Sequence, residues 1–142
     1  MSHSWGVKVL TLALLAASGG AMAQVEKYQV VGDGIPQPLT GKPGDAARGR
    51  TLLIKRDPAN CLACHSIKDK EMQPGGTKGP ALDGIGAALT AAQLRLSLVD
   101  MSRVAQGTIM PSFHKTSLGS STPKLTAEQI EDVVAYLSTL KK

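Results

Sequence analysis

The chain has 142 residues, of which 42% are hydrophobic and 3% aromatic, and its formal net charge is +5. This length suits a single folded domain, and the Lys and Arg residues are scattered without the basic blocks that are typical of nucleic-acid-binding proteins. A mildly positive surface of this kind either is simply solvated or attracts an acidic protein partner.

The first residues have the pattern of a secretory signal peptide. Lys8 precedes the apolar run VLTLALLAA, and the triplet Ala21-Met22-Ala23 fits the rule for signal-peptide cleavage, which predicts that residues 1–23 are removed after Ala23. The apolar run is about half of the roughly 20 residues that span a bilayer, and no later segment approaches that length. We therefore expect a periplasmic protein without a membrane anchor, although an uncleaved anchor is the alternative.

Aromatic residues are scarce in the remainder of the chain. Loss of Trp5 with the signal peptide leaves Tyr28, Phe113 and Tyr136. Aliphatic side chains alone can fill a core of ordinary density, but a large bound apolar group would also explain the shortage.

Residues 24–44 form an N-terminal extension that contains three prolines and four glycines. Such a composition predicts irregular structure, with at most a short extended piece at residues 28–31. Its role is open between a disordered tail and an arm that lies along a partner.

The segment 45–142 is expected to be one all-α domain with about three main helices. Asp45 is placed to cap the first helix, over residues 46–56. The pairs Thr90/Gln93 and Thr126/Gln129 match capping boxes that begin the second and third helices, each of which carries an apolar stripe. Between the helices lie long loops at residues 67–89 and 102–124, and loops of that length are usually functional or wrapped around something.

Both cysteines of the chain lie in the motif Cys61-Leu-Ala-Cys64-His65. A disulfide across so short a loop adds little stability, and a thioredoxin-like dithiol needs a βαβ setting that this helical pattern lacks. A structural zinc site needs four ligands, and beyond the motif only His114 remains as a further histidine after the signal peptide. CxxCH is the attachment motif of c-type haem, so Cys61 and Cys64 are expected to form thioethers with one covalent haem and His65 to ligate its iron.

The sixth iron ligand separates an electron carrier from a ligand-binding or peroxidatic haem protein. Met110 is our candidate because it lies in a loop far enough along the chain to reach the opposite haem face, and His114 is its main rival. Met72 follows the motif too closely, and Met101 continues the apolar stripe of the second helix, where core packing is the simplest role. A histidine and methionine pair predicts closed, six-coordinate iron suited to outer-sphere electron transfer, with residues 67–78 as a docking rim beside the haem edge.

The order CxxCH, GPALDGIG, Met110-Pro111 and a terminal helix with Tyr136 resembles the class I cytochromes c across residues 45–142. This resemblance implies helices and long loops wrapped around one haem c. It also implies that the carbonyl of Pro80 orients His65, and that Gly49 packs where the first helix crosses the last, beside Tyr136.

Five segments together narrow this resemblance to the SoxX family of monohaem cytochrome subunits from the bacterial sulfur-oxidising Sox system: GDAARGRTLL, NCLACHSIKD, GTKGPALDGIGAAL, TIMPSF and LTAEQIEDVVAYLSTLK. The chain departs from the family where Ser112-Phe113-His114 replaces an expected aromatic pair, which keeps His114 as an alternative ligand.

The resemblance implies a heterodimer with a SoxA-type haem subunit. That complex is an L-cysteine S-thiosulfotransferase that joins thiosulfate oxidatively to a cysteine of the carrier SoxYZ. The present chain would accept the released electrons and pass them to a soluble periplasmic cytochrome c, without a catalytic site of its own and without nucleic acid. A free-standing periplasmic electron shuttle that serves another redox enzyme is the alternative.

Overall fold

The computed structural model describes residues 27–115 and 123–142 together with Met1. The predicted signal peptide beyond Met1, residues 24–26 of the extension and residues 116–122 of the second predicted loop lie outside the described residues. The α-helices are α1 (Ala46–Lys55), α2 (Ile85–Ala88), α3 (Ala91–Asp100) and α4 (Ala127–Thr139), and the short 3₁₀ helices are η1 (Cys61–Ala63), η2 (Lys70–Met72) and η3 (Met101–Arg103). Pairing of extended backbone in the described part is limited to a bridge between Val31 and Gly34, so the all-α prediction is confirmed.

The three predicted helices are present as α1, α3 and α4, and each begins at its predicted cap. The Asp45 carboxylate accepts a hydrogen bond from the backbone N–H of Arg48, while Thr90 and Thr126 form complete capping boxes. Helix α2 lies inside a segment predicted to be a loop. It has only four residues, too few to show an apolar period in the sequence.

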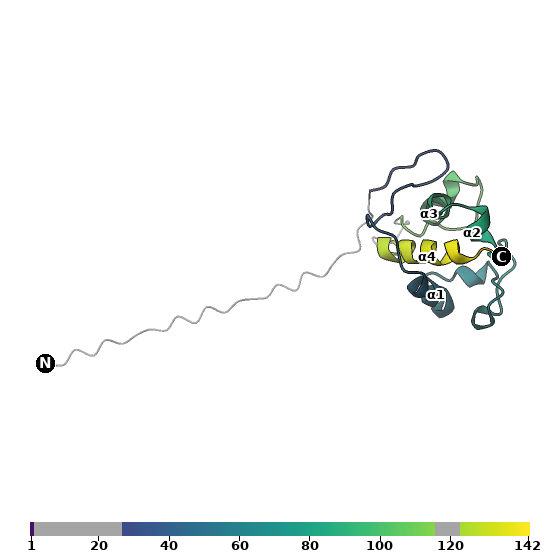
Figure 1. The fold of residues 1–142 in the computed structure, drawn as a ribbon, viewed down its shortest axis with the longest axis horizontal. Helices are drawn as coiled ribbons and strands as arrows, with labels where there is room; N and C mark the ends of the chain where they lie inside the picture. Colours follow the sequence, from purple (N-terminus) through teal and green to yellow (C-terminus); the bar gives the residue numbers. More distant parts are fainter. Residues whose placement is uncertain (2–26, 116–122) are drawn as a thin grey trace.

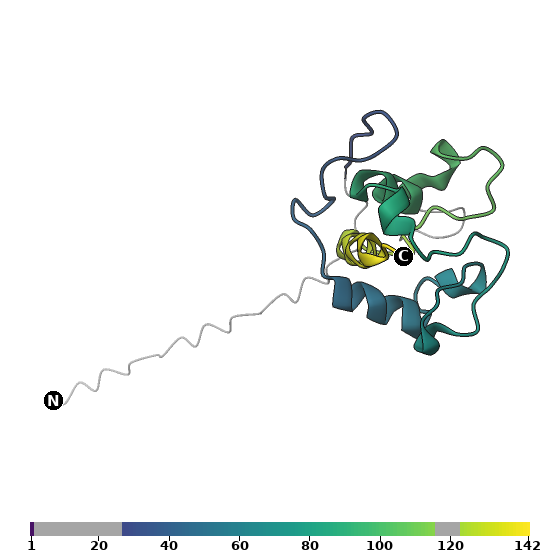
Figure 2. The same ribbon diagram turned by 45° about the vertical axis from the view of Figure 1, so that its right-hand side comes forward.

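Helix α4 lies at the centre of the domain, between α1 and α3 (Figure 2). Its crossing with α1 depends on Gly49, where a Cβ atom would lie 2.0 Å from the carbonyl oxygen of Asp132 and 2.9 Å from Cβ of Tyr136. Only glycine permits this approach, so the prediction that Gly49 packs against the last helix beside Tyr136 is confirmed.

A second contact of this crossing is polar. Arg48 donates two hydrogen bonds to the carboxylate of Asp132, both of 2.8 Å, and the backbone N–H of Asp45 donates a third of 2.7 Å. Asp132 therefore fixes the start of α1 on the surface of α4.

The crossing of α3 with α4 contains a buried ion pair. Arg95 donates to both carboxylate oxygens of Glu131, at 2.7 and 2.9 Å, and both side chains are at most 5% exposed. The same two side chains bind the N-terminal extension, because Arg95 donates to the carbonyl of Ile35 at 2.6 Å and Glu131 accepts from the N–H of Leu39 at 2.9 Å. Ile35 is itself 1% exposed and belongs to the core, so this part of the extension is folded against the domain beside α3 (Figure 1).

None of the helices in the described part of the chain has the length and apolar character needed to cross a membrane.

Candidate functional site

A cavity of about 420 Å³ opens beside the CxxCH motif, and a second cavity of about 190 Å³ extends from it toward the core. Cys61, His65, Pro80, Met101 and Met110 line both. The inner cavity is otherwise walled mainly by aliphatic side chains of α2, α3 and α4. A space of this size with apolar walls and a few convergent sulfur and nitrogen atoms is typical of a site for a large apolar ligand.

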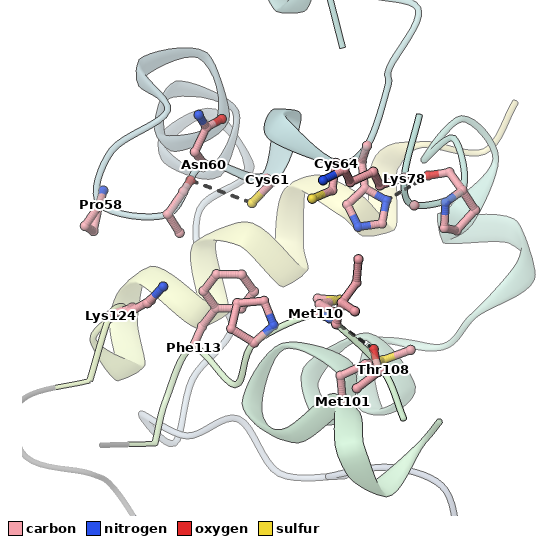
Figure 3. Close-up of a pocket in the computed structure, with 16 residues that line it drawn as sticks. Pro58, Asn60, Cys61, Cys64, Lys78, Met101, Thr108, Met110, Phe113 and Lys124 are labelled. Atoms are coloured by element: carbon pink, nitrogen blue, oxygen red, sulfur yellow. Dashed lines mark hydrogen bonds between the residues drawn. The ribbon is translucent and has the colours of Figure 1, made fainter. Parts of the chain in front are cut away.

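Cys61 and Cys64 lie at the same side of the outer cavity (Figure 3). The tight turn of η1 brings them there, with the N–H groups of Cys64 and His65 both donating to the carbonyl of Cys61. The two thiols are free and do not form a disulfide. Burial raises the pKa of the Cys61 thiol, so this sulfur is held as a neutral thiol at the cavity wall.

His65 is oriented by backbone groups. Its Nδ1 lies 2.7 Å from the carbonyl oxygen of Pro80. A carbonyl can only accept, so Nδ1 carries the hydrogen and Nε2 keeps its lone pair for a ligand. Gly79 lies directly against the ring, where an added Cβ would be 2.5 Å from Cε1 and 2.7 Å from Nδ1. The backbone of residues 79–80 thus limits both the rotation and the tautomer of the imidazole.

Met110 lies across the cavity from Cys61 and Cys64 (Figure 3). Its N–H donates to Oγ1 of Thr108 at 3.1 Å, and the turn before it places Gly107 at a φ of +72°. The prediction that Met101 packs in the core is wrong. Helix α3 ends at Asp100, so Met101 begins η3, is only partly buried and lines the cavity as a second thioether near Met110.

Two other residues considered for the sixth ligand lie elsewhere. His114 is fully buried and does not line either cavity. Met72 is also fully buried, and its sulfur lies 3.8 Å from the hydroxyl of Tyr136 in the core.

The donor atoms around the cavity fit a c-type haem. Two free thiols and an imidazole nitrogen are on the wall, thioether sulfurs lie on it as well, and the remainder is apolar. Within the described ranges there is no cluster of three or more His, Cys, Asp or Glu residues that could hold a metal ion by themselves.

The mouth of the outer cavity is basic and partly apolar. Lys78 and Lys124 line it, and Ile109 is 77% exposed beside Met110. Within the predicted docking rim of residues 67–78, Ile67 and Met72 are buried, so a contact there would be made by the polar side chains between them.

Sequence reasoning missed Asp100 and the pair Arg95/Glu131. All three are charged residues that the structure buries, and nothing in the spacing of Asp100 or Glu131 distinguishes these two from solvated charges on a helix. For Arg95, its position on α3 between the apolar residues Leu94 and Leu96 was the one available signal.

Comparisons with known proteins agree with this geometry. The family model described as cytochrome c matches residues 46–141, so the chain belongs to the cytochrome c family, whose members carry covalently bound haem c and transfer electrons. A chain of the crystal structure of SoxXA from P. pantotrophus is similar in fold, with a TM-score of 0.75 and 35% sequence identity over 81% of the present chain and 95% of that chain. This similarity supports the SoxX type of cytochrome that the sequence resembles. No curated protein matches the chain significantly.

Proposed function

We propose that this chain binds one haem c and is the electron-accepting subunit of a SoxAX-type L-cysteine S-thiosulfotransferase. The observation that carries the proposal is the match at 35% identity to nearly the whole length of a chain from the SoxXA structure. The cavity supports it further, because Cys61, Cys64, His65 and Met110 all line one space.

In this proposal Cys61 and Cys64 would hold the haem through thioether bonds, and His65 Nε2 and the Met110 sulfur would bind its iron. The haem supplies a one-electron redox couple whose potential a thioether ligand raises relative to a second histidine. The Pro80 carbonyl accepts a hydrogen bond from Nδ1–H of His65, which makes Nε2 a better electron-pair donor and keeps the ring fixed when the charge at the site changes. The apolar wall of α2, α3 and α4 excludes water from the inner side.

The chain has no catalytic site of its own in this proposal. A SoxA-type partner would join thiosulfate to a cysteine thiol of the SoxYZ carrier. The new S–S bond replaces the S–H bond, and one proton and two electrons are released. The present chain would accept these electrons one at a time, because a single haem is a one-electron couple, and would deliver each to a soluble periplasmic cytochrome c. The basic mouth formed by Lys78 and Lys124 favours an acidic surface on whichever partner docks there.

The proposal includes export and cleavage after Ala23, and a role for the extension in partner binding. The structure holds residues 35–39 against α3 and α4, so an arm would present its remaining exposed residues, among them Val31, which is 57% exposed. Deletion of residues 24–34 in the exported protein is then expected to weaken the heterodimer and to leave haem attachment unchanged.

The decisive experiment is a pull-down of the mature, haem-loaded protein from an extract of sulfur-oxidising cells, followed by identification of the partner and haem counting. A SoxA-type haem subunit in a one-to-one complex supports the proposal. Recovery of the protein as a monomer that exchanges electrons with another redox enzyme would instead favour a free-standing electron shuttle.

The ligands are tested separately by substitution. Replacement of both Cys61 and Cys64 by Ala is expected to give exported protein with the mass of the bare polypeptide. Met110→Ala is expected to abolish the far-red absorption band of methionine-ligated ferric haem, whereas Met101→Ala and His114→Ala retain it. Persistence of the band in Met110→Ala would transfer the ligand role to Met101, the other thioether that lines the cavity.

A further inference from the structure

Asp100 is a buried carboxylate that has no role in the proposed haem chemistry. It ends α3 and is 2% exposed. Its Oδ1 accepts from the hydroxyls of Ser102 at 2.5 Å and Ser112 at 3.3 Å, and its Oδ2 pairs with Lys115 and, at 3.3 Å, with Nε of Arg103. Four side chains from both ends of the segment 101–115 therefore converge on one carboxylate.

This position is unfavourable for a carboxylate on general grounds. The C-terminus of a helix carries a partial negative charge, which repels an anion, and burial of a charge costs free energy unless the charge is fully paired. Asp100 also makes no side-chain capping hydrogen bond to the start of η3. Its contacts thus benefit the loop after the helix and not the helix itself.

The loop depends on these contacts because its own backbone bonds are local. From Met101 to Thr108 the backbone hydrogen bonds outside the helices join residues only a few positions apart, such as Val104 to Met101 and Thr108 to Ala105. The second half is attached to α3 by the N–H of Phe113, which donates to the carbonyl of Leu98 at 3.0 Å. Asp100 joins the start of the loop at Ser102 to its end at Ser112, two residues after Met110.

Asp100 is ionised at neutral pH. Burial by itself would raise the pKa of this carboxyl, but hydrogen bonds from Lys115, Ser102 and Ser112 together hold the pKa below its ordinary value. The carboxylate of Asp100 therefore binds its four partners as a charged group at neutral pH.

We propose that Asp100 is a positioning residue for Met110: by binding both ends of the segment 101–115 it holds the thioether against the cavity. This inference rests on the proposed function, in which Met110 is the sixth ligand. Asp100 does not touch the iron site itself and acts only through the loop.

The test compares Asp100→Asn with Asp132→Asn in the haem-loaded protein. Both aspartates are buried and accept several hydrogen bonds, but Asp132 lies at the crossing of α1 and α4, away from the loop. The readouts are the far-red band of the ferric protein and CO binding to the ferrous protein, together with hydrogen exchange of the amides of residues 108–113.

Loss of the hydrogen bonds to a charged group is expected to raise the population with Met110 detached about ten- to hundredfold in Asp100→Asn. The band should weaken, CO should bind without denaturant, and the amides of residues 108–113 should exchange faster, whereas Asp132→Asn should keep the band and exclude CO. An unchanged band and unchanged exchange in Asp100→Asn overturns the inference.

Two further variants keep the outcome interpretable. If the wild-type protein lacks the band, or Met110→Ala retains it, the ligand assignment fails and not the role of Asp100. If Asp100→Asn does not accumulate, Ser112→Ala removes one of the four contacts and is expected to shift CO binding in the same direction by a smaller factor, and no shift in that variant contradicts the inference.

Discussion

The two sides of the cavity are built in different ways. On the histidine side, residues 59–82 are held by backbone hydrogen bonds to one another, including those from Gly76 to Leu62 and His65, and from Gly79 to Cys64. On the methionine side, four side chains of residues 101–115 converge on Asp100, and in the described part of the chain the backbone bonds outside the helices that reach beyond this segment are those of Phe113 with Leu98 and Leu125.

This difference separates a rigid wall from an adjustable one. Backbone bonds of the histidine side survive most substitutions of the surrounding side chains, provided that the glycines remain. The methionine side can be altered by single side-chain changes, because each tether belongs to one residue. Variation of the iron environment is therefore expected to arise on the methionine side.

The largest effect is expected from Arg95→Met, which breaks the support of the methionine side at the crossing of α3 with α4. Glu131 would remain buried without its cation, and loss of one partner of a buried ion pair costs about 3–5 kcal/mol. Urea denaturation of the haem-loaded protein measures the loss. The double variant Arg95→Met with Glu131→Leu should recover most of the stability, and failure to do so would mean that the bonds to Ile35 and Leu39 matter more than the buried charge.

A direct comparison of the two sides uses one glycine from each. In Gly76→Ala the new Cβ would lie 2.3 Å from the carbonyl oxygen of Ala63, so the backbone must move at a cost of about 3 kcal/mol. In Gly107→Ala the new Cβ would have no atom within 4 Å. The loss of stability then comes only from the strain of an alanine at a φ of +72°, which is about 1–2 kcal/mol. Thermal unfolding of both variants checks the order, and equal losses would contradict the distinction between the two sides.

Asp132→Asn tests the crossing of α1 with α4, which leads directly into the histidine side. Burial by itself would raise the pKa of Asp132, but hydrogen bonds from Arg48 and from the backbone of Asp45 hold this pKa below its ordinary value. Its stabilising effect is therefore fully present above the unfolded-state pKa of about 4 and is lost as the pH falls through the lower folded-state value. We expect a loss of about 2 kcal/mol at pH 7 that shrinks below pH 4.

Stability measured from pH 7 down to pH 2.5 for the wild type and Asp132→Asn checks this dependence. A difference that stays constant over the whole range would show that the carboxylate charge contributes nothing. In Asp132→Asn, hydrogen exchange should increase relative to the wild type more at residues 61–79, on the histidine side, than in the loop of Met110.

The smallest effect is expected from Thr108→Val, which removes the hydroxyl that accepts from the N–H of Met110. One hydrogen bond of this kind contributes about 1 kcal/mol, so the far-red band should disappear at a slightly lower temperature than in the wild type. The matched control is Thr51→Val on the exposed face of α1, which removes the hydrogen bond that the Thr51 hydroxyl donates to the carbonyl of Ala47. This variant should leave the band unchanged.

The contrast between the two sides also explains what could be predicted from the sequence. Helices α1, α3 and α4 carry capping residues and apolar stripes, and the CxxCH motif with Gly79 and Pro80 is local, so these features were accessible. Helix α2 is too short for a period to appear, and the turn of Met101 into the cavity depends on where α3 ends. The burial of Asp100, Arg95 and Glu131 depends on contacts between distant segments, which no local pattern encodes.

The contacts of α4 with the beginning of the domain set an order of assembly. The partners of Glu131 and Asp132 include Leu39, 92 positions away, and Asp45, 87 positions away, and Val133 and Leu137 of the same helix form part of the inner cavity wall. A chain that emerges from its N-terminus first cannot complete this wall until its last helix arrives. Cys61, which lines this inner cavity as well as the outer one, consequently stays uncovered on this side until Val133 and Leu137 are in place, and closure of the domain follows.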